Sequence, residues 1–519
     1  MGNKKSVENQ INPIVKSDYP DPDVIRVADT YYMISTTMHF MPGGVILRSY
    51  DLVNWEIASY IFDHLDDSPA ERLELESSNY AGGMWAGTLR YHEGTFYAAF
   101  VSHYAQKTYL FKTKDVCGEW QKQEMGGYFH DCSLLFDGDK KYVVYGNKTI
   151  YLTEMNDDLT APKEGGIHKV IIEDKTGAPL GYEGSHIYKL NGKYYIFFIN
   201  WPSEEPARRT ESCFVSDNVD GPYEGKVVFC DDRNYFNQGV AQGGIVDTPN
   251  GKWYSVMFQD SGAVGRMPIL VPITFEDDFP VFGINGKTPE NFRVTSSRPY
   301  YRYEPLYTSD DFVRDESLPL EKNFALQWQW NHQPDYSLIS MSKEGGLTIK
   351  TNKLVTNLTY AKNTLTQRTM FPKCEAEVTI DASNLKNGDR AGLCILQGDY
   401  GYLAVMKEAG SYYLIKVVRH NTIPSTKIGA SLDFFPGDTV SQIRLPEPKV
   451  TLCLKANFEN MSDSLDFYYL SDGKFVKVGA THDLKFRLDH FTGARFGLFV
   501  FSTSEVGGEA VFTRFIYRT

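Results

Sequence analysis

The first half of the chain repeats one pattern of hydrophobic and polar positions. Each copy has an apolar strand, a tight turn rich in Asp, Asn and Gly, and then an aromatic strand. Turn pairs such as Asn191-Gly192 and Asn250-Gly251 supply positive φ between β-forming residues, which predicts a β-hairpin in each copy. The five copies are DPDVIRVADTYYMIST (21–36), WAGTLRYHEGTFYAAFVS (85–102), DCSLLFDGDKKYVVYG (131–146), EGSHIYKLNGKYYIFFIN (183–200) and GGIVDTPNGKWYSVMFQD (243–260).

The spacing of the hairpins predicts a propeller. Their turns fall near positions 29, 94, 138, 192 and 251. Intervals of about 45 to 65 residues leave room for two further strands after each hairpin, which is the content of one four-stranded blade. A large β-sandwich with similar hairpins is the alternative, but sandwiches do not usually repeat one phrase five times at such an interval. We therefore predict five blades.

The second half of the chain predicts a different β-domain. A polar, turn-rich stretch at 296–322 has the composition of a connection between domains. Beyond it, apolar and polar residues alternate without the blade phrase, most clearly at 374–380 and 450–458. Period two with one apolar face indicates sheet packed on sheet. The predicted fold is all-β, with a five-bladed β-propeller over residues 1–310 and a β-sandwich over residues 311–519.

Composition adds limits on the partners. The chain has 519 residues, 42% hydrophobic and 23% charged, as expected for two folded soluble domains. Aromatic residues make up 14%, and such rings pack strands and also stack on sugars. The net charge of -13 argues against nucleic acid or an anionic membrane as partner. No apolar stretch approaches the roughly 18 to 20 residues that a membrane helix requires.

The cysteines and the N-terminus suggest a location. Seven cysteines, an odd number without a C-x-x-C pair, favour reduced thiols over a disulfide framework. The start, MGNKKSVENQINP, lacks the apolar core of a signal peptide. We therefore expect a cytoplasmic protein. The sequence leaves its oligomeric state open, and a homo-oligomer is one of the alternatives.

Candidate chemistry gathers at the starts of the repeated phrases. In a propeller the first strand of each blade lines the central channel, so these positions should converge. Burying several acids around one axis costs several kcal/mol without a purpose, and such a cluster therefore indicates function. The five positions are Asp21, Trp85, Asp131, Glu183 and, just before the fifth phrase, Gln242.

Three converging acids fit the hydrolysis of a glycosidic bond. One acid protonates the leaving oxygen and another activates water, with the two carboxyls roughly 6.5 to 9.5 Å apart when the anomeric configuration is inverted. The third acid can raise the pKa of the proton donor through its own negative charge. No group of His and acidic residues has the spacing of a closed zinc site, so no catalytic metal is predicted.

Taken one at a time, these residues have ordinary explanations. Asp21 lies between two prolines and could be a turn residue, Asp131 could cap a strand, and an isolated Glu183 could be solvated surface. Trp85 could belong to the core, and His130 is more easily explained as a structural neighbour than as a ligand. Only their shared position in the repeat turns the acids into a candidate site.

At these residues the sequence resembles glycoside hydrolase family 43, the β-xylosidases and α-L-arabinofuranosidases. NPIVKSDYPDPDVIRVADTYYMISTT resembles the opening of that family, which implies that Asp21 is the general base. FHDCSLLFDGDKKYVVYG resembles its second acidic phrase, which implies that Asp131 tunes the pKa of the proton donor and orients it. GYEGSHIYKLNGKYYIFF resembles the third, which implies that Glu183 is the general acid.

The resemblance also implies substrate contacts and a second domain. GMWAGTLRYHEGTFY is similar to a family phrase in which Trp85 would wall the sugar site. Phe40 in MHFMPGG and Arg266 in VGRMPILVPITF stand where the family has an aromatic wall and an arginine that contacts the substrate. LQWQWNH and AKNTLTQR are similar to the concanavalin-like sandwich of many xylosidases. In such proteins the sandwich often closes one side of the pocket and favours release of single sugars from chain ends.

The chain departs from the family pattern at Gln242, where many members have a histidine near a bound calcium. A neutral amide can still form hydrogen bonds, so Gln242 is predicted to contact the substrate. No cofactor is expected to be required, and a structural calcium is left open. Cys132 and Gly87 also stand where the family more often has proline.

The predicted function is an exo-acting, inverting glycoside hydrolase that releases pentose units from xylan- or arabinan-derived oligosaccharides, as a β-1,4-xylosidase, an α-L-arabinofuranosidase or both. An endo-acting arabinanase or xylanase on the same fold is one alternative. A non-catalytic, lectin-like sugar-binding protein is another, although it leaves three converging acids without a role. Loops that no repeat fixes would decide between xylose and arabinofuranose.

Overall fold

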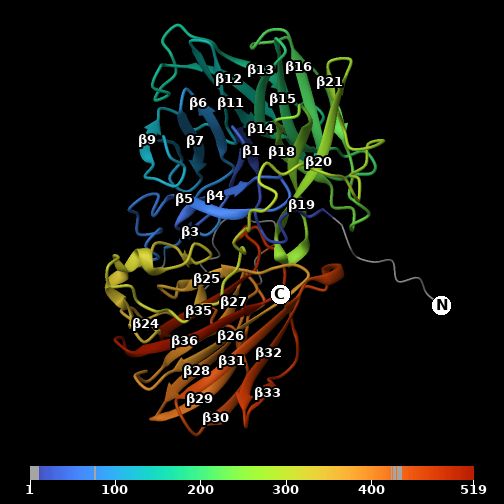
Figure 1. Ribbon diagram of the computed structural model, residues 1–519. Coiled ribbons are helices and arrows are strands. Elements are labelled where there is room, and N and C mark those ends of the chain that lie inside the picture. Colours follow the sequence, from blue (N-terminus) through green and yellow to red (C-terminus); the bar gives the residue numbers. More distant parts are fainter. Residues whose placement is uncertain (1–10, 75–76, 422–423, 425–427, 429–434) are drawn as a thin grey trace, which may run out of the picture.

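The computed structural model describes residues 11–519, apart from 75–76, 422–423, 425–427 and 429–434. The chain is all-β, with a five-bladed propeller and a β-sandwich that lies against one side of it (Figure 1). The prediction that the chain lacks a signal peptide concerns mainly residues 1–10, which lie outside the described residues. Among the described residues, no helix is both long and apolar enough to span a bilayer.

The five repeated phrases form the two inner strands of five four-stranded antiparallel blades, as predicted. The third and fourth strands come from the sequence after each phrase. The blades are β1 (Asp23–Val27), β2 (Thr30–Ser35), β4 (Gly43–Ser49) and β5 (Glu56–Phe62); β6 (Thr88–His92), β7 (Thr95–Ser102), β8 (Lys107–Thr113) and β9 (Gln121–Met125); β10 (Ser133–Asp137), β11 (Lys140–Asn147), β12 (Thr149–Met155) and β13 (His168–Glu173); β14 (Leu180–Leu190), β15 (Lys193–Trp201), β16 (Thr210–Ser216) and β17 (Glu224–Phe229); β18 (Val240–Asp247), β19 (Trp253–Asp260), β20 (Arg266–Glu276) and β21 (Phe279–Phe282).

Turn residues within each hairpin explain the individual blades, and apolar packing between neighbouring blades closes the propeller. At the β14–β15 turn, Asn191 and Gly192 have φ values of 51° and 85°, as the hairpin signal requires. Apolar side chains gather in clusters between neighbouring blades, including one between the fifth blade and the first. The segment before β1 reinforces this closure, because the Ile14 N–H donates to the Pro268 carbonyl of β20 at 3.0 Å.

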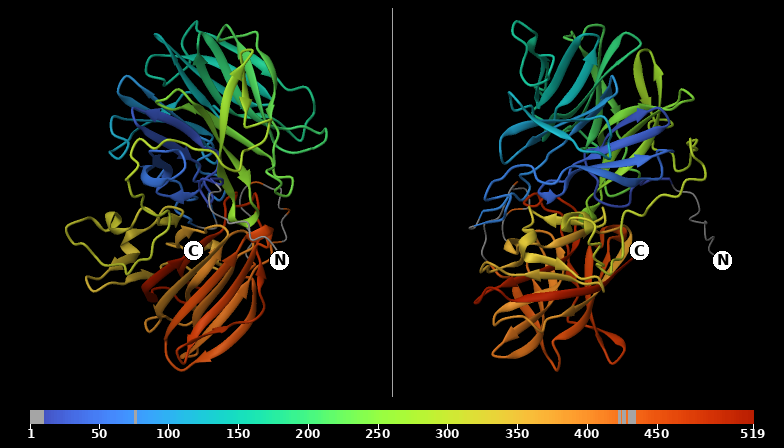
Figure 2. Two further views of the ribbon diagram at one scale, coloured as in Figure 1. Left: turned by 45° about the vertical axis from the view of Figure 1, so that its right-hand side comes forward. Right: turned by 60° about the vertical axis from the view of Figure 1, so that its left-hand side comes forward.

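The sandwich consists of two large antiparallel sheets (Figure 2). Between them lies the largest apolar cluster of the described residues. The alternating segments predicted at 374–380 and 450–458 are strands that turn their apolar face into this core. In sheet order, the first sheet has β3 (Phe40–Met41), β22 (Gln329–Asn331), β25 (Leu365–Arg368), β35 (Arg495–Ser502), β27 (Asp389–Leu396), β28 (Gly401–Glu408), β29 (Ser411–Val418) and β30 (Asp438–Leu445); the second has β23 (Ile339–Met341), β24 (Leu347–Lys350), β36 (Glu509–Arg518), β26 (Lys373–Asp381), β31 (Lys449–Asn457), β32 (Ser464–Ser471) and β33 (Lys474–Lys477), with β34 (His482–Asp483) beside β32.

The two domains share a strand as well as a connection. β3 belongs to the first half of the chain, yet it pairs with β22 of the sandwich, with Phe40 opposite Asn331. The long connection between Phe282 and Gln329 holds one short helix. The described 3-10 helices are η1 (Gly262–Val264), η2 (Leu320–Asn323), η3 (Tyr336–Leu338), η4 (Leu358–Tyr360) and η5 (Glu459–Met461). All seven cysteines lie among the described residues and are free thiols.

Candidate active site

The structure brings six of the seven predicted site residues around one cavity at the start of the inner strands. The cavity is small, about 50 Å³. It lies where the first strands of the blades converge, as the repeat predicted. Its walls are Asp21, Met38, Trp85, Ala86, His130, Asp131, Glu183, Gln242, Arg266 and Phe491.

An unusual backbone conformation aims several of these side chains into the cavity. Asp21, Asp131 and Gln242 have φ values of 53°, 47° and 58°, in the left-handed region that residues other than glycine seldom adopt. In the fourth blade the residue after Glu183, Gly184, takes this conformation with φ 65°. Left-handed residues cost about 1 to 3 kcal/mol each and cluster at functional sites. Their occurrence at the same point of several blades indicates that the strain belongs to the site.

Asp21 is a buried carboxyl with one strong partner. Its Oδ1 accepts a hydrogen bond from Arg266 Nη1 at 3.0 Å, and both side chains are buried. Burial raises the pKa of Asp21 above its ordinary value, although the positive charge of Arg266 opposes the shift. A carboxyl with a raised pKa is a stronger proton acceptor when ionised, which suits a general base.

Asp131 and Glu183 lie close together, with His130 between them. One polar atom of each of these three residues lies within 4.8 Å of the other two. His130 Nε2 is 3.7 Å from Asp131 Oδ2 and 3.9 Å from Glu183 Oε2. Burial raises the pKa of Asp131, with His130 opposing the shift and Glu183 adding to it. The negative charge of Asp131 in turn raises the pKa of His130 to about 9.

Neighbouring blades orient these two acids. Asn147 Nδ2, at the end of β11, donates a hydrogen bond to Glu183 Oε2. The backbone N–H of Gly184 donates to Asp131 Oδ2 at 3.2 Å. Both contacts join the third blade to the fourth. The two carboxyls are therefore held in one place by partners on both sides of the blade interface.

Aromatic rings form the remaining wall, and one of them comes from the sandwich. Trp85 stacks on His103 with ring centroids 4.2 Å apart, and its Nε1 donates to the Ala81 carbonyl. Phe491, just before β35, lies edge-on to Trp85 at 5.9 Å, and its ring is 4.6 Å from the Arg266 guanidinium carbon. The second domain thus completes the cavity.

Asp18 fixes the sandwich loop that carries Phe491. Its Oδ1 accepts a hydrogen bond from the Arg266 N–H at 2.8 Å, and its Oδ2 accepts one from the Gly493 N–H at 2.7 Å. The same carboxylate therefore joins β20 to the loop before β35. Asp18, His130, Asn147 and Phe491 were not selected from the sequence as site residues, and only His130 carried a signal there, its place beside an acid at a phrase start.

Phe40 is the one predicted substrate contact that the structure does not bring to the cavity. Its ring is buried in an apolar cluster of the sandwich, and the guanidinium carbon of Arg495 lies 3.5 Å from its centroid. The reason is β3, which pairs with β22 and carries Phe40 away from the channel into the domain interface. Met38, two residues earlier, lines the cavity instead.

The channel beside the cavity holds an ion-pair network. Asp23 has no exposed surface, and its carboxylate lies 2.6 Å from Arg90 Nη1 and 3.3 Å from His186 Nδ1. Burial alone would raise the pKa of Asp23, but Arg90 and His186 outweigh it and hold the pKa below its ordinary value. Asp23 is therefore already paired with two side chains of the channel. The structural calcium that the family resemblance left open stays a prediction.

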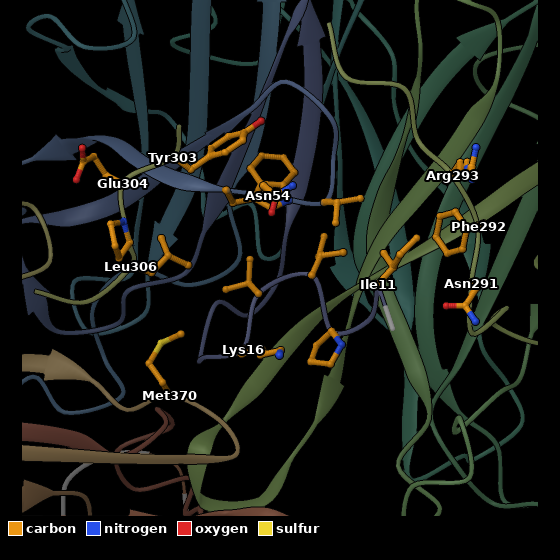
Figure 3. Close-up of a pocket in the computed structure, with 16 residues that line it drawn as sticks. Ile11, Lys16, Asn54, Asn291, Phe292, Arg293, Tyr303, Glu304, Leu306 and Met370 are labelled. Atoms are coloured by element: carbon orange, nitrogen blue, oxygen red, sulfur yellow. The ribbon is translucent and has the colours of Figure 1, made fainter. Parts of the chain in front are cut away.

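A larger groove lies elsewhere and contains none of the predicted site residues. It measures about 1100 Å³ and runs between the N-terminal segment, the loop after β4 and the connection to the sandwich (Figure 3). Ile11, Asn54, Phe292 and Tyr303 are among the side chains that line it. Size alone would favour this groove, but it lacks the convergent carboxyls that hydrolysis requires.

A five-bladed propeller with three carboxyls in one cavity, closed by a ring from an attached sandwich, defines a class of glycoside hydrolases. The model of the family "Glycosyl hydrolases family 43" matches residues 11–280. The model "Beta xylosidase C-terminal Concanavalin A-like domain" matches residues 320–518. The chain therefore belongs to glycoside hydrolase family 43 and carries the family's concanavalin-like second domain.

Individual relatives cover nearly the whole chain. A β-xylosidase of Formosa agariphila is 28% identical and aligns over 96% of this chain and 88% of its own length. A non-reducing end α-L-arabinofuranosidase of Bacteroides ovatus is 23% identical over 86% of this chain and 84% of its own. A bifunctional GH43-CE protein of Bacteroides eggerthii has a similar structure, with a TM-score of 0.89 and 39% identity over 98% of this chain, which spans 64% of that longer protein.

Replacing Phe491 with alanine tests whether the sandwich serves the site. We expect KM for a nitrophenyl pentoside to rise about tenfold with a smaller change in kcat, because a ring stacked on a sugar or a guanidinium contributes about 1 kcal/mol. Steady-state kinetics measure both constants. The matched control is Phe475→Ala, an exposed ring on β33 of the same domain, which should leave them unchanged. Equal kinetics for the two variants would show that Phe491 does not contact the substrate.

Proposed function

We propose that this chain is an exo-acting, inverting pentosidase that removes xylose or arabinofuranose units from oligosaccharides derived from xylan or arabinan. The observation that carries the proposal is the meeting of Asp21, Asp131 and Glu183, from three blades, in one cavity. Both kinds of activity, β-xylosidase and α-L-arabinofuranosidase, occur in the names of the relatives.

In this proposal the three acids have distinct roles. Asp21 takes a proton from water as the water attacks the anomeric carbon, and Glu183 gives a proton to the departing oxygen. Asp131 lies beside Glu183, where it can orient the acid toward the departing oxygen. Trp85, Arg266 and Gln242 would hold the sugar from three sides. No step requires a metal or a cofactor.

The shape of the site favours release of terminal units. Phe491 lies across one side of the cavity, next to Trp85 and Arg266, where an internal unit of a long chain would need an open passage. The endo-acting alternative has a precedent among similar structures. A solved GH43 hydrolase, with a TM-score of 0.85 and 27% identity to this chain, was engineered to show both endo-xylanase and exo-arabinofuranosidase activity.

The first experiment follows the configuration of the released sugar. Proton NMR during hydrolysis of a nitrophenyl β-xyloside should show α-xylose first and β-xylose only as mutarotation proceeds. Initial release of β-xylose would contradict inversion. Parallel rates on the nitrophenyl α-L-arabinofuranoside rank the two pentoses, and failure to cleave either glycoside would contradict the proposed substrate class.

A further inference from the structure

Glu211 is a buried acid outside the cavity whose position requires an explanation. It belongs to β16, the third strand of the fourth blade, and has no exposed surface. Its Oε2 accepts one hydrogen bond, from the backbone N–H of Gln242 at 2.7 Å, while Oε1 has no partner among the described residues. Burial raises the pKa of Glu211 to about 8. A buried carboxyl with a single partner is costly, and such groups in folded proteins usually have a reason.

The partner of Glu211 is the most irregular point of β18. Pairing between β18 and β19 shifts register between Ala241 and Gly243, so Gln242 sits in a bulge. Its φ of 58° places it in the left-handed region. A bulged residue has an N–H that the strand ladder does not use, and burying it without an acceptor would cost about 1 to 3 kcal/mol. Glu211 supplies that acceptor from the neighbouring blade.

The side chain of Gln242 reaches the acids from this bulge. It lies against Gly184 so closely that a Cβ at position 184 would be 2.7 Å from Gln242 Cγ. The N–H of Gly184 donates to Asp131, and Gly184 follows Glu183 directly. Gln242 also lines the cavity. Any movement of its backbone would therefore move an amide that is next to both acids.

The surroundings of Glu211 favour a backbone-fixing role over a role in charge pairing. Glu211 lies opposite Ile199 of β15, and Ile199 packs with Ala241 and Phe258 in a small apolar cluster. The effects on its carboxyl are burial and the Gln242 N–H, with no charged partner. The other acids near the site differ, since Asp21 pairs with Arg266 and Asp23 with Arg90.

We propose that Glu211 is a positioning residue that holds the Gln242 backbone in its bulge, so that the Gln242 amide contacts a hydroxyl of the bound pentose. An amide is suited to a neutral sugar because it can donate and accept at once. This inference rests on the proposed function of the cavity, and it adds a specificity element from outside it.

The test uses three variants of the full-length protein. Glu211→Met keeps the side-chain length and removes the acceptor, and we expect KM for the pentoside to rise about tenfold. The melting temperature should change little, because the lost acceptor of the Gln242 N–H and the removed cost of a buried carboxyl act in opposite directions. Glu211→Gln still accepts the N–H through its amide oxygen, and its KM should stay within about threefold of wild type. Glu154→Met, a buried acid on the third strand of the third blade paired with Lys163, is the matched control and should keep the wild-type KM.

A double variant that combines Glu211→Met with Gln242→Ala distinguishes a positioning role of Glu211 from a general packing defect. Gln242→Ala alone should raise KM about tenfold, and adding Glu211→Met should raise it no further, whereas independent effects would multiply to about a hundredfold. Multiplying effects, or a wild-type KM in Glu211→Met, would overturn the inference. A KM for Glu211→Gln as high as that of Gln242→Ala would also overturn the inference. This measurement remains possible even if Glu211→Met folds poorly.

A structural measurement keeps this inference apart from the proposed function. If the wild type cleaved neither pentoside, the proposed function would fail, and a crystal structure of Glu211→Met would still decide the positioning role. We expect residue 242 to leave the left-handed region or its side chain to leave Gly184. An unchanged backbone and side chain at Gln242 would overturn the inference without reference to activity.

Discussion

Glu183→Gln is expected to reduce kcat on a nitrophenyl pentoside by about 10² to 10⁴-fold, which is the usual contribution of a general acid. The loss should depend on the leaving group. Dinitrophenolate departs readily without a proton, so hydrolysis of a dinitrophenyl glycoside should retain much of its rate. The leaving sugar of an oligosaccharide needs the proton, so hydrolysis of an oligosaccharide should lose most of its rate. Steady-state rates on the three substrates measure this dependence.

The matched control for Glu183→Gln is Glu224→Gln, the same change at an exposed position of β17 in the same blade. It should leave all three rates unchanged. A uniform loss across the three substrates in Glu183→Gln would mean that the residue acts by position or packing and gives no proton. The hydrogen bond from Asn147 can persist with Gln, because the amide oxygen still accepts it, so the fold should be retained.

The fold was predictable because its signals are local. Each hairpin is marked by a turn such as Asn191-Gly192 between an apolar strand and an aromatic one. Few folds other than a propeller fit five such copies at a regular interval. The acids were predictable for the same reason. Asp21, Asp131 and Glu183 stand at equivalent points of the repeat, and the symmetry of a propeller brings equivalent points together.

The parts of the site that were not predicted depend on contacts between distant segments. Phe491 reaches the cavity only because the sandwich docks on the propeller, and Asp18 holds it through a hydrogen bond to Gly493, 475 residues away in the chain. Phe40 lies away from the cavity because its partner strand, β22, belongs to the other domain. Glu211 has no motif at all, since its role depends on a bulge in the next blade.

The loss of activity should depend on the leaving group in the Glu183 variant and be independent of it in an Asp21 variant, and this contrast is the strongest test of the assignment of base and acid. Water must be activated whatever group departs. Asp21→Asn should therefore lower kcat by about 10² to 10⁴-fold on the activated and the unactivated glycoside alike. Asp29→Asn, at the half-exposed β1–β2 turn where Asp29 pairs with Arg298, is the matched control and should leave the rates unchanged. Full activity in Asp21→Asn would end the assignment.

Removing the Asp21 carboxylate altogether allows a chemical rescue. In Asp21→Ala, azide can occupy the space beside Arg266 and attack the anomeric carbon without losing a proton, so it needs no base. With the dinitrophenyl glycoside, added azide should restore turnover and give a glycosyl azide of inverted configuration, as NMR can show. An azide product of retained configuration would instead indicate a covalent intermediate and exclude Asp21 as the base. Thermal unfolding must accompany this assay, because Arg266 loses its partner in a buried pair, a change that typically costs about 3 to 5 kcal/mol.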